Sequence, residues 1–549
     1  MRMRALRDSQ GSFGYSRTSQ GAALSPNDRP ERTGEDETRA RGPERVNQRA
    51  IAACVLVALA AIVAIAAASA GGETGVILSS IAMSSFLLAG LSVVSLVGGP
   101  RTLFNLRLGP GVIGYASIAF GVATMTALND KFISAIVNVA AINSSLLIIS
   151  GGFLVLVLGY MQRSASYPLS HAVDTVMRQA SKMRSPIQRG TLALYVVFLA
   201  GLTADGIKIA VAGQFGYLGD ATLVTIASAT WYSQPLEIAS NLKLAAIFGL
   251  SLGAFKEWPA RRALSLIPAL VIAVPLSLAT GMKESFVDIV VAVLIAYVFA
   301  RRRVRLMPVF LAVVMFVVVV TPFVTQLRLD VRGSEVLGVD EALERVLSQA
   351  QAEDGYFEDV DAVDSGLQVL SRLRLVDNLV VIRENTPEFI EYRQITDILV
   401  APFQGIIPRA VWPEKPIRLA GYDFYKIYYQ GQGESSSAIT LQGSLYMHGG
   451  IGVFLLGMFM VGIALRAIDD GLKAQTNPHG ALMIVLIAPL VVKQEMDVPG
   501  FLAGIPIIIL TWVMCTWLVF RPADGDPPPV HLNSVQGYEV RSVFGGPRR

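Results

Sequence analysis

The chain has 549 residues, of which 53% are hydrophobic and only 16% are charged. Charged residues make up about a quarter of an ordinary soluble domain, so this composition excludes a soluble globular protein and favours a membrane protein. The formal net charge of +4 gives no indication of a nucleic-acid partner. Both cysteines, Cys54 and Cys515, lie in apolar stretches, which argues against a disulfide framework or a zinc site.

Residues 1–49 are rich in Arg, Gly, Ser and acidic side chains and have no apolar period, which is typical of a disordered tail. This stretch is too long and too charged for the first region of a cleavable signal peptide. The first apolar span is therefore predicted to be a signal anchor. Residues 521–549, with Asp-Pro-Pro-Pro at 526–529, are predicted to form a second disordered tail.

Between these tails we predict an all-α polytopic membrane protein with about 12 transmembrane helices, because uncharged stretches of about 20 residues recur. Residues 50–325 hold the first nine and residues 446–520 the last three. The predicted spans are 50–70, 76–97, 111–128, 132–161, 191–209, 236–255, 263–279, 285–300, 306–325, 446–466, 480–492 and 501–520. The short span 480–492, which Pro489 interrupts, is expected to be tilted, broken or paired with the next as a re-entrant hairpin.

Lysine and arginine are concentrated in alternate connections between these spans. The basic connections carry Arg101, Arg107, Arg163, Arg178, Lys182, Arg184, Arg189, Lys256, Arg261, Arg262, Arg301, Arg302, Arg303, Arg305, Arg466 and Lys473. The intervening short connections hold little beyond Lys131, Lys283 and Lys493. The positive-inside rule then places both termini in the cytoplasm. Residues 326–445 become one large extracytoplasmic loop.

The first part of this loop, from Glu335 to Asp364, is strongly acidic. A solvated, partly helical face explains it; cation binding is the alternative, although no calcium-loop spacing supports it. The next segment, Ser365–Arg383, has leucines at near-helical spacing and predicts an amphipathic helix on the membrane domain. The alternative is that Arg372, Arg374 or Arg383 contacts phosphate at the outer leaflet.

A proline-rich turn follows, from Pro408 to Pro416, and its fixed φ angles make it stiff. Arg409, Lys415 and Arg418 on such a turn suit a pyrophosphate, which charge-assisted hydrogen bonds hold well. Trp412 suits either a sugar face or the membrane interface. An ordinary interfacial anchor of Trp and basic residues is the other interpretation.

Five aromatic residues follow within eight positions, and they suit stacking on sugar rings or an aromatic belt at the headgroups. They are Tyr422, Phe424, Tyr425, Tyr428 and Tyr429. Other candidates are ionisable residues near the ends of spans, since charge at membrane depth is costly. These are Asp205, Lys208, Glu237, Lys243, Lys283, Glu284, Lys493, Glu495 and Asp497. They form either mutual ion pairs, such as Asp205 with Lys208, or an outward-facing cavity for a charged headgroup.

Several of these features together resemble the bacterial O-antigen polymerase (Wzy-type) family. They are the Pro408-Arg409 step, the aromatic-Pro-x-Lys-Pro turn at 412–416, the serine-containing polar loop after it, and Gly443–Gly457, which opens a helix. The small-residue turn Gly281-Met-Lys283 before a span is similar as well. The resemblance covers roughly residues 190–520, and 407–457 is its most specific block.

The resemblance implies a glycosyltransferase that polymerises undecaprenyl-pyrophosphate-linked repeat units outside the cytoplasmic membrane of a bacterium. It implies no nucleotide sugar and no other cofactor, because the lipid pyrophosphate is already activated. It implies no metal, because guanidinium groups can replace one at the pyrophosphate. The implied partners are lipid-linked oligosaccharide, membrane lipids and a chain-length regulator protein. The implied substrate-binding residues are Lys283, Arg383, Trp412, Lys415, Arg418, Tyr422 and Tyr425. The implied catalytic residues are Arg409 in a pyrophosphate clamp, and Glu414, Asp423 or His448 as the base; His448 alternatively caps a helix.

Three other functions fit the same sequence. An O-antigen ligase-like transferase shares the helices, the large outside loop and the basic residues. A secondary transporter of lipid-linked sugars is the alternative from another class, although residues 50–255 and 263–520 show no clear internal similarity. A sensor or assembly scaffold would leave Arg409 replaceable.

Overall fold

The structure is a computed structural model, and it describes most of the chain between residues 42 and 523. The described ranges are 42–68, 72–97, 106–129, 137–212, 232–256, 264–279, 283–301, single positions between 307 and 324, 362–409, 411–412, 414–415, 420–430, 437 and 439–523. Met1–Ala50 forms one unit and Ile51–Arg549 another. Residues 1–41 and 524–549 of the predicted tails fall outside the described residues, as does most of the acidic stretch that begins at Glu335. The prediction of a disordered tail to residue 49 was wrong for 42–49, which form the start of a helix that continues into the first apolar span.

The described residues are mostly helical, and eight of their helices are long and apolar enough to cross a membrane. These are α2 (Gly42–Ala68), α3 (Gly72–Val97), α4 with η2 and η3 (Leu108–Ala116, Ser117–Gly121, Val122–Leu128), α5 (Val139–Met161), α7 (Thr191–Ala212), α9 with α10 (Ser233–Ser240, Leu242–Lys256), α22 (Gly450–Leu472) and α24 (Val498–Val519). Two apolar helices are shorter: α12 (Ile267–Ala279) and α23 (Pro478–Val492). The apolar α13 (Lys283–Arg301) carries charges at both ends. A polytopic α-helical membrane protein fits this arrangement.

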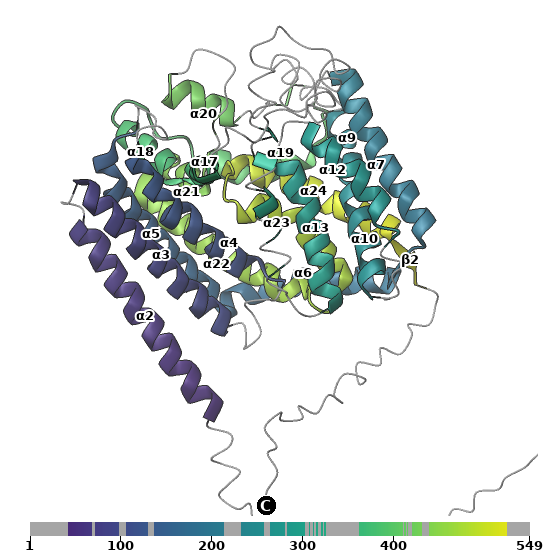
Figure 1. Cartoon of the computed structure of the whole chain (residues 1–549), viewed down its shortest axis with the longest axis horizontal. Coiled ribbons are helices and arrows are strands. Elements are labelled where there is room, and N and C mark those ends of the chain that lie inside the picture. The colour runs from purple at the N-terminus through teal and green to yellow at the C-terminus, as the bar shows by residue number, and fades with distance from the viewer. Residues whose placement is uncertain are drawn as a thin grey trace, which may run out of the picture. The chain divides into compact units, whose positions relative to one another are not determined.

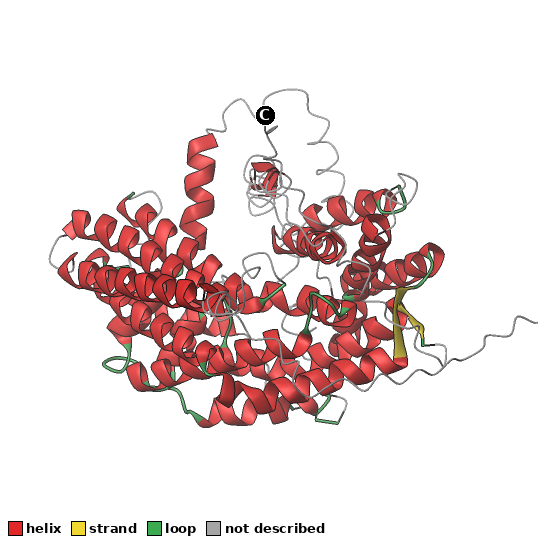
Figure 2. Ribbon diagram, turned by 90° about the horizontal axis from the view of Figure 1, so that it is seen from below, coloured by secondary structure: helices red, strands yellow, loops and turns green. Residues whose placement is uncertain are grey.

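Two groups of shorter elements lie at opposite ends of the spanning helices (Figure 1). One end, here named the loop side, holds α17 (Ala362–Leu373), α18 (Val376–Asn385), α19 (Thr396–Ile406), α20 (Ala420–Tyr428) and α21 (Leu441–Met447). The other end, named the basic side, holds α6 (Arg163–Met183), β1 (Arg184–Gln188) and β2 (Phe520–Pro522). The two strands, yellow in Figure 2, pair antiparallel, with Arg184 opposite Pro522. Order therefore extends past the predicted start of the tail at Arg521.

Helices α5 and α22 run parallel and touch through glycine. A Cβ added at Gly159 would meet the backbone oxygen of Phe459, and one at Gly462 would meet that of Leu156. Lipid gives no hydrophobic driving force between spanning helices, so close van der Waals contact of this kind must hold them together. Helix α22 also packs against α6, where Gly471 contacts the backbone of Ser170.

The segment 365–383, predicted as one amphipathic helix, is instead divided into α17 and α18. Arg374, in the break, forms an ion pair with Asp377 and donates from Nη1 to Thr126 Oγ1 at 2.9 Å. Helix α18 is buried nearly all round, since Leu379 and Val380 are each 0% exposed. It is therefore inserted into the core beside α5 and α21, and only α17 keeps a marked amphipathic pattern.

The predicted span 446–466 also begins later, at Gly450. Gly450 has φ of +63°, a left-handed value that disfavours side chains, and its α-carbon faces the Tyr392 hydroxyl. This glycine turn separates the short α21 from α22. Residues 441–447 thus belong to the loop side rather than to a span.

We predict that Gly462→Ala destabilises the protein by about 1–3 kcal/mol, since the new methyl group would collide with the α5 backbone. Gly452→Ala on the same helix is the matched control, because nothing lies within 4 Å of its added Cβ. That control is expected to be neutral or stabilising by about 0.5–1 kcal/mol. Thermal unfolding of both purified variants in detergent measures the difference, and equal melting temperatures would contradict the close contact.

Candidate functional site

A cavity of about 530 Å³ opens on the loop side between α9, α10, α13, α23 and α24. Its described polar lining is mainly acidic: Glu237, Asn241, Glu284, Asp288, Lys493, Glu495, Asp497 and Thr511. Apolar side chains, including Pro489, Phe501 and Ile507, form much of the rest. The lining follows α24 from Asp497 to Thr511, which at the helical rise is about 20 Å of a hydrocarbon core about 30 Å thick.

Ion pairs between helices hold several charges at and near this cavity. Lys493 Nζ lies 2.6 Å from Glu284 Oε1. Lys208 pairs with Glu237, and Lys243 pairs with Asp205. The expected pair of Asp205 with Lys208 on one helix was therefore wrong. Gly201 lets α7 approach the backbone at Lys243 closely, so each of the two residues finds its partner on the neighbouring helix.

Two cavity carboxylates have environments that suit a reactive group. The Asp288 Oδ1 atom is buried and has no hydrogen-bond partner among the described residues. Burial raises the pKa of Glu495, and the nearby Glu284 raises it further while Lys493 opposes the shift. Sequence reasoning named Glu495 as a candidate but missed Asp288, although an acidic residue inside the predicted span 285–300 was a usable signal.

His448 follows the end of α21 and is only 2% exposed. Its Nδ1 donates to the Ser444 carbonyl oxygen at 2.6 Å, because that oxygen can only accept. Its Nε2 is left as an acceptor with no hydrogen-bond partner among the described residues. Burial lowers the pKa of His448, which favours the neutral ring. Ser444 also donates from Oγ to Asp497 at 3.3 Å and so links this corner to the cavity lining.

A glutamine network fixes the connection that carries Glu495 and Asp497. Gln442 Nε2 donates to Gln494 Oε1 at 2.6 Å, and Gln494 Nε2 donates to the Val112 carbonyl at 2.9 Å. The Leu441 N–H donates to the Gln494 carbonyl at 2.8 Å. Three elements, α21, α4 and the turn before α24, are thereby joined.

The proline-rich turn is closed by its own basic residues. Arg409 is 8% exposed and donates from Nη1 to the Lys415 carbonyl at 2.7 Å. Lys415 Nζ donates to the Ile407 carbonyl at 3.1 Å, while Glu414 is exposed and Trp412 half-buried. Arg418 lies outside the described residues. The Arg409 Nη1 and Lys415 Nζ donors therefore stabilise the conformation of the turn itself.

Helix α19 positions this turn. Gly405, near its end, lies directly against the backbone of Ala503 on α24. The neighbouring α24 residues Phe501 and Gly504 line the cavity. The turn therefore follows a helix that is held at the cavity wall.

The aromatic run mainly attaches α20 to α18. Phe424 is 0% exposed, and its ring centroid lies 5.1 Å from that of Tyr428. Tyr428 shares a 2.7 Å hydrogen bond with Thr386 Oγ1. Tyr425 stacks on Tyr429 with centroids 5.7 Å apart. Tyr422 is half-buried and Asp423 is exposed, so sugar stacking by Tyr422 and Tyr425 stays a prediction.

The predicted site residues are not gathered in the cavity. None of the catalytic and substrate-binding residues that the resemblance implies is among the described residues of its lining, whereas the span-end candidates Glu237, Glu284, Lys493, Glu495 and Asp497 are. Lys283 begins α13, next to the lining residue Glu284, and Arg383 is half-buried at the end of α18. The candidates of the turn and of α20 lie on elements other than those that enclose the cavity. The charged residues near span ends, rather than the predicted clamp, supply most of its polar lining.

Residues 217–475 match a family described as a domain of unknown function (DUF8712). The match includes Glu237, Glu284 and Asp288 of the cavity lining, but ends before α23 and α24. No curated protein and no solved structure has significant similarity to the chain.

We predict that Phe424→Ala destabilises the loop side by about 3–5 kcal/mol, because a large buried ring is removed from the contact between α20 and α18. Ile427→Ala is the control on the same helix, since Ile427 is 44% exposed. Thermal unfolding and limited proteolysis around α20 measure the effect. A Phe424→Ala protein as stable as the control would argue against the packing role.

Proposed function

We propose that this protein is a membrane glycosyltransferase that polymerises undecaprenyl-pyrophosphate-linked oligosaccharide repeat units. In this proposal the loop side is extracytoplasmic, both termini are cytoplasmic, and about twelve spans cross the inner membrane of a bacterium. The cavity on the loop side is the observation that carries the proposal. The Wzy-type resemblance of residues 407–457 supports it independently.

The acidic cavity suits the sugar end of an acceptor. Carboxylates accept hydrogen bonds from hydroxyl groups, and Asn241 both donates and accepts. The apolar side chains of α23 and α24 offer contacts for the carbon faces of a sugar ring. A volume of about 530 Å³ is within the usual range for small-ligand sites.

Glu495 is the general base in this proposal. A carboxylate with a raised pKa takes a proton more readily than an ordinary one, which improves general-base catalysis near neutral pH. The acceptor hydroxyl attacks the anomeric carbon of the donor and loses its proton to Glu495. A glycosidic bond forms as the bond from carbon to the pyrophosphate oxygen breaks, with inversion.

The leaving pyrophosphate needs positive charge, which the acidic lining does not supply. Lys493 lies in the lining, and Arg409 and Lys415 add two positive charges on the turn that follows α19. In this proposal the pyrophosphate binds between Lys493 and the turn that carries Arg409 and Lys415. The clamp expected from the sequence is retained as a proposal, with Lys493 added to it.

We predict that Glu495→Gln lowers glycan elongation by about 10²–10⁴-fold, since the base is removed with little change in shape. Each variant would replace the wild-type gene in a deletion strain, and the measurement is the repeat-length distribution on the acceptor. Asp288→Asn is expected to shorten the chains as well, whereas Glu388→Gln, an exposed carboxylate on the loop side, should give full-length polymer.

The pH profile adds an independent check. Activity should fall as the pH falls through the raised pKa of Glu495, because the protonated acid cannot act as a base. Single repeats on the acceptor in the deletion strain support a polymerase, and unattached long chains identify a ligase instead. Full-length polymer from Glu495→Gln would remove Glu495 from the reaction.

A secondary transporter is the second candidate, and Asp288 favours it. Acidic residues inside spans typically mark proton and cation pathways, and Asp288 Oδ1 has no hydrogen-bond partner among the described residues. Proteoliposomes with an internal pH dye separate the two functions. Substrate-dependent proton uptake that Asp288→Asn abolishes, with the substrate chemically unchanged, would establish transport and exclude polymerisation. Covalent elongation without proton uptake would establish polymerisation and exclude transport.

A further inference from the structure

A second cavity, of about 630 Å³, lies on the basic side between α6, the end of α22 and the residue before α4. Its lining carries five cationic and two acidic side chains, which leaves three positive charges in excess. The cations are Arg107, Arg163, Arg178, Arg466 and Lys473. The enzymatic proposal above does not use this cavity, which lies at the opposite end of α22.

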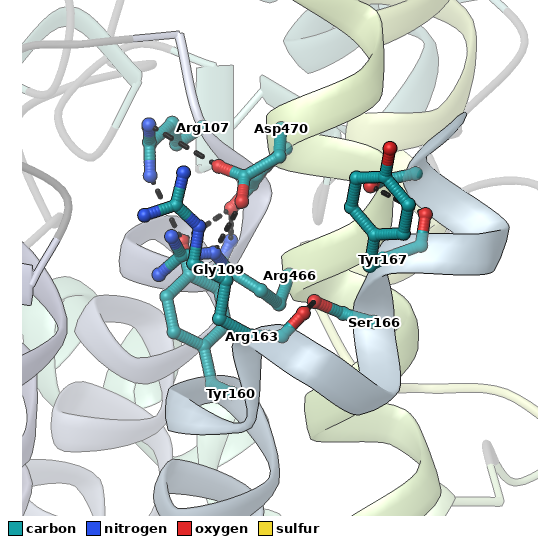
Figure 3. A network of polar contacts seen from close by, with 10 residues as sticks. Arg107, Gly109, Tyr160, Arg163, Ser166, Tyr167, Arg466 and Asp470 are labelled. Atoms are coloured by element: carbon teal, nitrogen blue, oxygen red, sulfur yellow. Dashed lines mark hydrogen bonds and ion pairs between the residues drawn. The ribbon is translucent and has the colours of Figure 1, made fainter. Parts of the chain in front are cut away.

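Arg466 is the most informative group in this lining. It is 6% exposed, its Nε donates to Asp470 Oδ2 at 2.5 Å, and its guanidinium carbon lies 5.5 Å from the Tyr160 ring centroid. Its buried Nη1 has no hydrogen-bond partner among the described residues. A buried donor without an acceptor is costly, so a ligand oxygen at this point would be stabilising. Figure 3 shows Arg466 beside Arg107 and Asp470.

The nearby carboxylates do not cancel this charge. Asp470 is shared between Arg466 and Arg107, whose Nη2 lies 3.5 Å away. The buried Asp469 instead accepts from the first two backbone N–H groups of α4, at 2.6 and 3.0 Å, and from the Tyr160 hydroxyl at 2.8 Å. Asp469 therefore fixes the start of α4, and the excess of cations remains.

On the α6 side of the cavity, too, cationic side chains outnumber acidic ones. Asp174 pairs with both Lys473 and Arg178, at 2.7 and 2.8 Å, and the hydrogen bond from Lys473 is the main reason that its pKa is lowered. Arg163 lines the cavity and has no acidic partner among the described residues. It is exposed, so its charge is accessible to a ligand.

We propose that this cavity binds the phosphate group of an anionic ligand, with Arg466, Arg107 and Arg163 as its contacts. Arginine suits this chemistry, since its planar fork matches phosphate oxygens. The phosphate can belong to the headgroup of an anionic phospholipid or to a soluble phosphate.

The surface of α6 favours the lipid source. Leu169, Val176 and Met183 recur every seven residues on this helix and are 46%, 48% and 49% exposed. Such a stripe on a basic amphipathic helix is typical of a helix lying in the membrane interface. A cationic cavity beside it stands at the depth of lipid phosphates, where basic pockets between helices bind anionic headgroups.

Native mass spectrometry of the full-length protein, titrated with phosphatidylglycerol, tests the proposal. Wild type should retain the lipid saturably. Arg466→Gln and Arg163→Gln should each weaken the apparent Kd by about tenfold or more, because a charge-assisted contact is lost. Arg163→Gln keeps the test decisive if Arg466→Gln fails to fold, since Arg163 is exposed.

Lys182→Gln is the matched control, because Lys182 is exposed on the same helix and does not line the cavity. It should bind phosphatidylglycerol like wild type. A second experiment titrates inorganic phosphate and measures the rise in melting temperature. A rise that saturates in wild type and is lost in Arg163→Gln would support a soluble phosphate ligand. Equal binding by wild type and Arg163→Gln in both experiments, or phosphatidylcholine bound as tightly as phosphatidylglycerol, would overturn the site.

Discussion

The parallel contact between α5 and α22 is the constraint on which the cationic cavity depends, because that cavity is lined by the end of α22 and by Arg163, just after α5. Gly159 and Gly462 bring the two backbones into van der Waals contact, and lipid offers no hydrophobic gain to replace that contact. This contact also fixes where the residues at the two ends of α22 lie. On the basic side it presents Arg466 to the cationic cavity, and Asp469 ties it to α4. On the loop side it begins at the glycine turn that follows His448.

Charge at membrane depth is compensated between helices rather than within them. The pairs that Lys243 and Lys208 form join α7 to α9 and α10, with partners 38 and 29 positions away in sequence. The Lys243–Asp205 pair is partly buried and constrains helix position, whereas Glu237 is 59% exposed and its pair with Lys208 is a weaker constraint. Removing one partner of a buried pair leaves an uncompensated charge, which costs about 3–5 kcal/mol for a fully buried pair and less for these. Of these four residues Glu237 lines the acidic cavity, so its pair with Lys208 links α7 to the cavity wall.

The spanning helices could be predicted because each is a long apolar stretch, and that signal needs no partner. The ion pairs could not be predicted, since Asp205 has one lysine on its own helix, Lys208, and another on α10, Lys243, and only packing decides between them. The buried α18 was misread as amphipathic, although the unbroken run Leu379-Val-Val-Ile382 has no polar face. Helix α6 was read only for its basic residues, and its apolar stripe, from Leu169 to Met183, was overlooked.

Part of the candidate site could also be predicted from the sequence, because the cost of charge near a span end needs no knowledge of packing. Glu237, Lys493 and Glu495 were selected because charge near a span end is costly, and that physical rule correctly identified lining residues. Arg409 was selected because a stiff basic turn suits pyrophosphate. The structure shows that at least one of its donors closes the turn itself, a use of the residue that sequence pattern does not distinguish from ligand binding.

The proposed reaction places its two substrates differently because of charge and volume. Five carboxylates in the lining repel a pyrophosphate, while they favour the hydroxyl groups of an acceptor. A cavity of about 530 Å³ holds the end of one oligosaccharide but no polymer, so a growing glycan must lie at the rim and extend into water. Bond formation is then confined to the boundary between the acidic cavity and the basic turn. Glu495, in the connection before α24, belongs to the lining of the acidic cavity.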